Sequence, residues 1–135
     1  MPDRRGAFHL SERPLRNKQA ATGFLEAASS GRAQARADLF TPGAKHHNAH
    51  FPAGIPALLA AMDDNARQFP KKVYRVVNAV ADVEMVAVHG HVVLKPGDSG
   101  ISVVHLFRFE GEKVAELWDV GQPIPADSPN KDGAL

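Results

Sequence analysis

The sequence predicts an α+β domain in which two helices come first and an antiparallel sheet follows. Before Pro70, apolar residues recur at three- and four-residue steps, which is the period of an amphipathic helix. After Pro70, four valine-rich segments are joined by short turn-forming links, which is typical of an antiparallel meander. A chain of 135 residues has the length of one domain. We therefore expect the helices to cover one face of a single sheet.

The chain is expected to divide into three parts. Residues 1–15 are polar and arginine-rich and are interpreted as a flexible tail. The folded domain is expected over residues 16–126. Residues 127–135 follow a proline-containing segment that favours extended backbone, so they are interpreted as a C-terminal arm.

The helices are predicted from their apolar spacing and from the residues that end them. The first is expected over residues 17–30, and a shorter helical piece over residues 33–40. A polar, histidine-rich link over residues 45–50 is expected to be irregular or extended, because prolines and glycines flank it. The second long helix is expected over residues 55–69, since Pro70 cannot continue it.

The strands are predicted from their β-branched residues and from the turn chemistry between them. Each segment is rich in valine, and the links contain Gly, Asp, Ser or Pro. The predicted strands are residues 73–81, 85–94, 101–109 and 114–120.

Composition excludes several classes of function. The 16 basic and 15 acidic residues give a net charge of +1, so no basic field favours a nucleic-acid partner. The absence of cysteine removes disulfides and thiol nucleophiles, and fits a reducing compartment. No apolar run approaches the roughly 20 residues that span a bilayer, and no signal-peptide pattern follows the basic N-terminus. The expected protein is cytoplasmic, with no membrane partner.

Histidine is the residue type that points to a site, because six of the seven histidines lie between residues 46 and 105. On a strand, His89 and His91 share one face, and on the next strand His105 shares a face with Phe107. If Val93 pairs with Val103, His91 lies opposite His105, with Cβ atoms about 4.5–5.5 Å apart. A register slip of one residue would separate them, and a single buried imidazole is commonly a hydrogen-bonded structural group.

Two segments carry a resemblance to a known family. They are VHLFRFEGEKVAELWDV with the following QPIP, at residues 104–120 and 122–125, and HNAHFPAGI at residues 47–55. Over residues 17–126 the chain resembles the SnoaL-like polyketide cyclase family of the NTF2-like superfamily. The resemblance implies a cystatin-like cone, in which a curved sheet wraps on the helices around a deep pocket for a small, mostly apolar molecule. It also implies a homodimer through the outer sheet face, and neither a metal nor another cofactor.

The resemblance also suggests site residues. In cyclases of this family an acid/base aspartate begins a strand motif, and His105 stands in its place, while His91 matches a pocket histidine. His47 and Asn48 match the motif before the long helix and are expected at the pocket mouth. Histidine suits proton transfer near neutrality, because its ordinary pKa is about 6.5.

The first functional hypothesis is a cyclase, isomerase or lyase that uses general acid–base chemistry on a carbonyl compound. His105 would take a proton next to the carbonyl, His91 would stabilise the oxyanion or orient His105, and Asp119 would fix an imidazole tautomer. The residues expected to contact the substrate are His47, Asn48, His89, Phe107 and Trp118.

Two other hypotheses remain open from the sequence. His89, His91 and His105, or two of them with His47, have the ligand type of a three-histidine metal site. The cone is also compatible with a module that binds a ligand without changing it.

Overall fold

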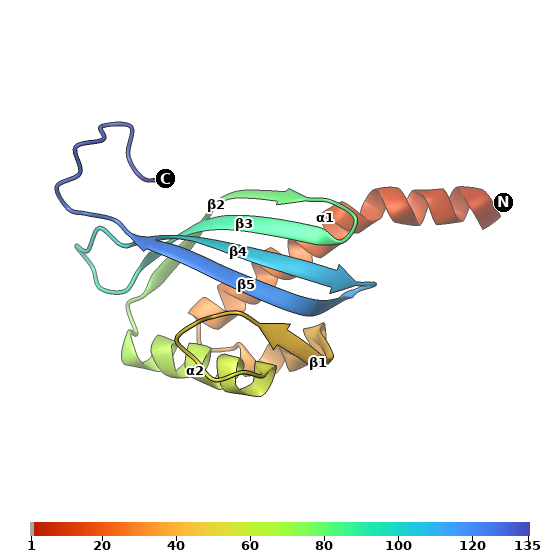
Figure 1. Cartoon of the computed structure of the whole chain (residues 1–135), viewed down its shortest axis with the longest axis horizontal. Helices are drawn as coiled ribbons and strands as arrows, with labels where there is room; N and C mark the ends of the chain where they lie inside the picture. The colour runs from red at the N-terminus through yellow and green to blue at the C-terminus, as the bar shows by residue number, and fades with distance from the viewer. Residues whose placement is uncertain (1) are drawn as a thin grey trace.

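The computed structural model describes the backbone of residues 2–135 and the side chains of residues 12–135. Its five-stranded sheet has the order β1-β5-β4-β3-β2, and two long helices lie against one face (Figure 1). The α+β class is therefore confirmed. In chain order the elements are α1 (Pro2–Ser29), the 3-10 helix η1 (Gln34–Leu39), β1 (Phe40–His46), α2 (Ile55–Gln68), β2 (Val73–Ala81), β3 (Met85–Val93), β4 (Ile101–Glu110) and β5 (Lys113–Pro123).

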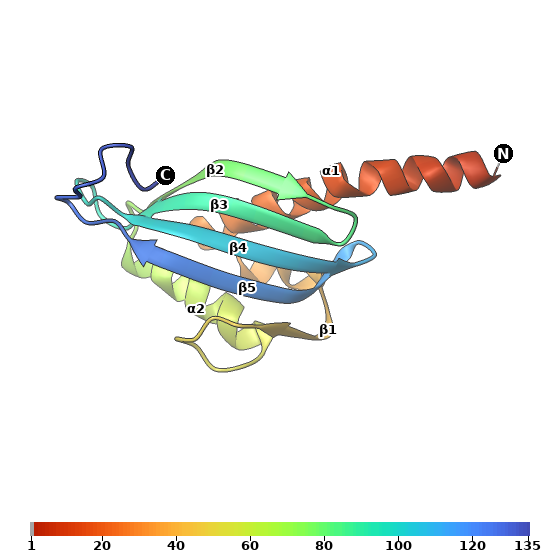
Figure 2. The same ribbon diagram turned by 45° about the horizontal axis from the view of Figure 1, so that its top comes forward.

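The core lies between the helices and the inner face of the sheet. Phe24 of α1 packs edge-on against Phe40 and Phe107, with ring centroids 5.2 and 6.2 Å apart. Leu58 and Leu59 of α2 are almost fully buried in the same cluster. Figure 2 shows the curved sheet in front of both helices, which is the cone that the resemblance implied.

Helix α1 begins earlier than the sequence predicted. It runs from Pro2, whereas residues 1–15 were expected to form a flexible tail and the helix to start at residue 17. Its N-terminal part projects past the edge of the sheet in Figure 1. The later start was predicted because residues 1–15 are polar and arginine-rich. Pro14 lies inside the helix and removes one backbone hydrogen bond there. Met1 lies outside the described residues.

Strand β1 was missed by the sequence analysis. It pairs in parallel with β5, and its register shifts between Phe40 and Lys45. Pro42 and Gly43 lie within this irregular stretch, and such residues are tolerated in a strand that occupies the edge of a sheet. The pattern of alternating side chains that reveals a strand is therefore absent, and residues 45–46, expected in an irregular or extended link, belong to β1.

The predicted register of β3 and β4 is wrong. Val103 pairs with Gly90 instead of Val93, a shift of three residues. Because the side-chain period of a strand is two, an odd shift moves His91 to the opposite face from His105. The connection is longer than expected, and Gly100 within it has a φ of +88°. A Cβ at Gly100 would lie 2.6 Å from the His91 ring, so this turn accommodates His91 on the outer face.

Candidate active site

A cavity of about 500 Å³ opens between α2, the loop before it and the inner face of β3, β4 and β5. Its apolar walls include Leu58, Met62 and Val103. A second cavity of about 530 Å³, beside η1 and β1, is lined by no titratable side chain. The first cavity is therefore the candidate active site. Its polar lining residues are Asn48, His50, Asn65, Lys72, His105 and Asp119.

His105 and Asp119 lie side by side on the wall of this cavity because their strands pair them directly. His105 follows the inward alternation of β4 and is 6% exposed. Its Nε2 lies 3.6 Å from Asp119 Oδ2, which is an ion-pair distance. Asn48 Nδ2 donates a hydrogen bond of 2.8 Å to the same carboxylate oxygen. The sheet thus holds an imidazole beside a carboxylate at the wall of an apolar cavity.

The surroundings of Asp119 keep it ionised. Burial alone would raise the pKa of this carboxyl, but the interactions with His105 and Asn48 and the nearby His50 together lower it below its ordinary value. Asp119 therefore presents a negative charge to the His105 ring.

The second ring nitrogen of His105 has no hydrogen-bond partner among the described residues. His105 Nδ1 is buried and has no hydrogen-bond partner in the described part of the chain. A buried polar atom without a partner is costly, so a bound molecule that supplies one is favoured. A carboxylate beside Nε2 favours the tautomer that carries its proton on Nε2, in which Nδ1 presents a lone pair.

His46 holds the loop that presents Asn48. Its Nε2 donates to the carbonyl oxygen of Pro52 at 2.7 Å, and its Nδ1 accepts from the backbone N–H of Asn48 at 3.2 Å. Both ring nitrogens are thereby satisfied, and the imidazole is structural. The position of Asn48 beside Asp119 follows from this bridge.

The structure does not bring the other predicted histidines to His105. His89 Nε2 pairs with Ser102 Oγ at 2.9 Å, and His91 Nε2 pairs with the carbonyl oxygen of Ser99 at 2.9 Å, both on the outer face. The prediction that His91 lies opposite His105 is therefore wrong. The same separation prevents the suggested set of His89, His91 and His105 from binding one metal ion. Among residues 12–135, no group of three or more His, Cys, Asp or Glu side chains is placed to hold a metal.

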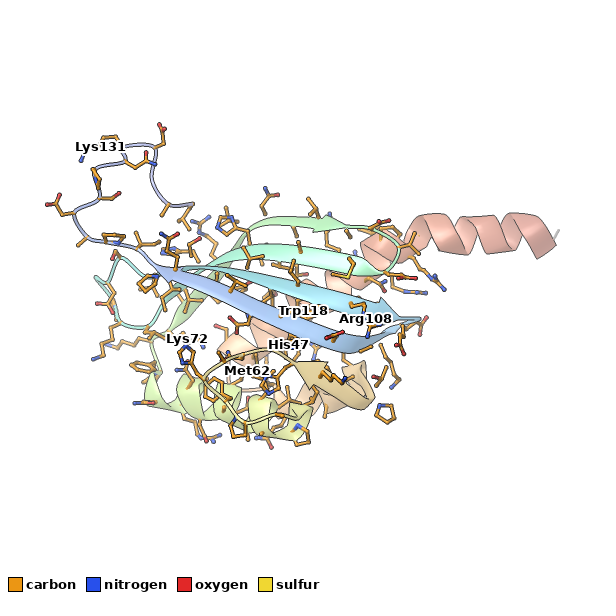
Figure 3. All side chains as sticks on the ribbon, in the orientation of Figure 1. His47, Met62, Lys72, Arg108, Trp118 and Lys131 are labelled. Carbon is orange, nitrogen blue, oxygen red and sulfur yellow. The ribbon has the colours of Figure 1, made fainter. Side chains whose placement is uncertain are left out.

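Trp118 of β5 lies on the outer face, and His47 lies beside it (Figure 3). Their rings stack with centroids 5.2 Å apart, and His47 Nε2 is 2.6 Å from Glu116 Oε2. Phe107 points inward but is completely buried in the core beneath His105. Of the eight residues that the sequence proposed, the cavity is lined by His105, Asp119 and Asn48.

Two groups that line the cavities were missed, Lys72 and Tyr74. Lys72 lies just before β2, and Tyr74 is two residues further along. The alternation of a strand places residues two apart on one face, so the spacing was a usable signal. It was overlooked because Val76 and other apolar neighbours gave β2 the pattern of an ordinary core strand.

The fold and the cavity define a class: an α+β cone with an ionisable pair in a mostly apolar pocket. The sequence model of the SnoaL-like domain family matches residues 21–117 of this chain. The chain therefore belongs to the SnoaL-like family. No protein of curated function matches it by sequence.

Solved structures show the same fold. IdmH from Streptomyces antibioticus, described as a proposed polyketide cyclase, is 19% identical, with 78% of this chain and 91% of that chain covered and a TM-score of 0.64. A proposed ketosteroid isomerase from Kribbella flavida is 17% identical, with coverages of 88% and 87% and a TM-score of 0.66. An NTF2-like protein of unknown function from Cytophaga hutchinsonii is 12% identical, with coverages of 78% and 98% and a TM-score of 0.61.

Proposed function

We propose that the protein is a small-molecule enzyme that uses His105 as a general acid–base group on a carbonyl compound in the cone. The observation that carries the proposal is the pairing of His105 Nε2 with Asp119 on the cavity wall, while His105 Nδ1 is buried and has no hydrogen-bond partner among the described residues. A base oriented by a carboxylate is the arrangement that proton transfer needs.

The proposed reaction begins with removal of a proton from the carbon next to the carbonyl. The imidazole of His105 accepts this proton, the C–H electron pair forms an enolate, and the imidazolium is stabilised by the Asp119 carboxylate. Return of the proton to another carbon gives an isomer. Attack of the enolate carbon on a second carbonyl within the molecule forms a C–C bond instead, and His105 then protonates the new alkoxide, which is ring closure.

The size and lining of the cavity support a small, mostly apolar substrate. About 500 Å³ is a typical volume for a small-molecule site, and most lining residues are apolar. Two structural neighbours are described as a proposed polyketide cyclase and a proposed ketosteroid isomerase, and both names refer to carbonyl-containing substrates. Isomerisation and aldol-type ring closure both begin with this proton transfer.

The test follows deuterium uptake from D2O at the α-carbon of 2-tetralone by mass spectrometry. Wild-type protein should accelerate the uptake, and His105→Ala should reduce the acceleration about 100-fold or more. His91→Ala is the matched control, since it removes a histidine from the neighbouring strand on the opposite face, and it should retain the wild-type rate.

Uptake by His105→Ala at the wild-type rate would refute the acid–base role. A wild-type protein that binds 2-tetralone in the cavity but never accelerates exchange would instead favour the ligand-binding alternative.

A further inference from the structure

A smaller cavity of about 80 Å³ lies next to the main one and reaches helix α1. The two cavities share Met62, Lys72, Val92 and His105 as lining residues. A water needs roughly 10–15 Å³ of such space, so the small cavity has room for a polar head group. His105 lies at the boundary, where a substrate in the main cavity reaches the smaller one.

Lys72 brings the only ammonium group among the residues that line these two cavities. Its Nζ donates a hydrogen bond of 2.8 Å to Asn65 Oδ1, a neutral amide. Within residues 12–135, no carboxylate forms an ion pair with it. Burial lowers the pKa of Lys72, which shows that its charge is incompletely solvated. A partly desolvated cation without a counter-ion favours binding of an anion.

Tyr74 adds a neutral hydrogen-bond donor to the same small cavity. Its hydroxyl is buried and has no partner among the described residues, as is true of His105 Nδ1. Burial, with a smaller contribution from the charge of Glu26, raises the pKa of Tyr74 to about 12, so the phenol keeps its proton. The ring lies over Gly90, where a Cβ would come within 2.5 Å of it. The missing side chain at position 90 therefore makes room for this hydroxyl.

The charges of the two cavities differ in how they are balanced. The Asp119 carboxylate has His105 and Asn48 beside it, and it lines only the main cavity. Lys72 has a neutral partner, and Tyr74, whose buried hydroxyl has no partner among the described residues, lines the same small cavity. An unbalanced positive charge with an unused donor suits an oxygen that carries negative charge.

We propose that the small cavity binds an anionic oxygen of the substrate, recognised by Lys72 and Tyr74. The proposal rests on the assignment of the adjoining main cavity as the substrate site. The anionic oxygen has two sources with the same chemistry. It is either a carboxylate that the substrate already carries, or the enolate oxygen that forms when His105 takes the α-proton.

The carboxylate source is tested by calorimetric titration with 2-naphthoate and its neutral analogue 2-naphthamide. Wild-type protein should bind 2-naphthoate at least about tenfold more tightly, as expected for a charge-assisted contact. Lys72→Met, which keeps the length of the side chain, should abolish this preference, and Tyr74→Phe should reduce the affinity for 2-naphthoate severalfold. Lys71→Met removes the exposed neighbouring lysine and should change neither affinity.

The enolate source is tested with 2-tetralone, which has no carboxylate. Here Lys72→Met should slow α-deuterium uptake at least about tenfold, while thermal unfolding stays close to wild type. Equal wild-type affinities for 2-naphthoate and 2-naphthamide, together with unchanged 2-tetralone uptake in Lys72→Met, would overturn the proposal. Loss of uptake in His105→Ala is independent of that result, so failure of the anion site and failure of the base are distinguishable.

Discussion

At the scale of single residues, the partners of each histidine decide what it can do. His46 has both ring nitrogens occupied by backbone groups and braces a loop. His89 and His91 each pair with a group on the outer face. His105 lies on the cavity wall, with a carboxylate beside one nitrogen and a second nitrogen that has no partner among the described residues. Sequence identified His105 and Asp119 as candidates, but it could not give the hydrogen bond from Asn48, which depends on the loop before α2.

The lowered pKa of Asp119 predicts a pH-dependent contribution to stability. Its carboxyl titrates below its ordinary value of 3.8 when folded, so the stabilisation is present above that pH and is lost as the pH falls through the lower, folded pKa. The Asp119→Asn variant lacks this contribution. The free energy of unfolding of the variant, measured with urea at about pH 5 and about pH 3, should therefore decrease less on acidification than that of the wild-type protein.

Asp98→Asn, in an exposed loop, is the control for this measurement and should follow the wild-type decrease. An Asp119→Asn protein that loses as much stability as wild type over the same interval would show that Asp119 is not stabilised as a carboxylate.

At the scale of elements, the sequence predicted those helices and strands that are determined by the spacing of nearby apolar residues. Strand β2 has the predicted bounds, and the bounds of β3 and α2 differ by one residue each. Edge strand β1 was missed because its parallel pairing with β5 is a long-range contact that Pro42 and Gly43 disguise. The register of β3 on β4 was wrong because it depends on the conformation of the connecting loop, which the side-chain alternation does not specify.

Asp63 connects two elements and predicts a specific loss of stability. This carboxylate of α2 is 4% exposed and accepts hydrogen bonds from the backbone N–H groups of Ala33 and Gln34 at 2.7 and 3.1 Å. Asp63→Ala leaves these donors at the start of η1 unpaired, so the free energy of unfolding should fall by about 1–3 kcal/mol in urea titration. Asp64→Ala, its exposed neighbour, should change it by less than about 0.5 kcal/mol. Equal effects in the two variants would contradict the bridging role.

At the scale of the whole molecule, the two faces of the sheet differ in what covers them. The inner face and the helices enclose the cavities, whereas the outer face is left uncovered in the single chain (Figure 2). Val80 and Val120 on the outer face are 63% and 64% exposed. None of the helices in the described part of the chain is long and apolar enough to cross a membrane.

We propose that a second copy of the chain covers the outer face. Exposed apolar side chains on a sheet face mark an interaction surface, and a net charge of +1 per chain gives little repulsion between two copies. Light scattering after size exclusion should give twice the chain mass of 14.5 kDa. Val120→Glu should shift the protein to the monomer mass, while Val120→Thr, with a similar shape, should remain dimeric. A monomeric wild type would contradict the dimer.

The central claim is that His105 and Asp119 act as one unit in proton transfer. The most direct measurement is deuterium uptake by 2-tetralone with wild type, His105→Ala, Asp119→Asn and the double variant. We predict that each single change lowers the rate sharply and that Asp119→Asn causes no further loss once His105 is alanine, because the carboxylate acts through the imidazole. Independent, multiplying losses, or an unchanged rate in His105→Ala, would contradict the account.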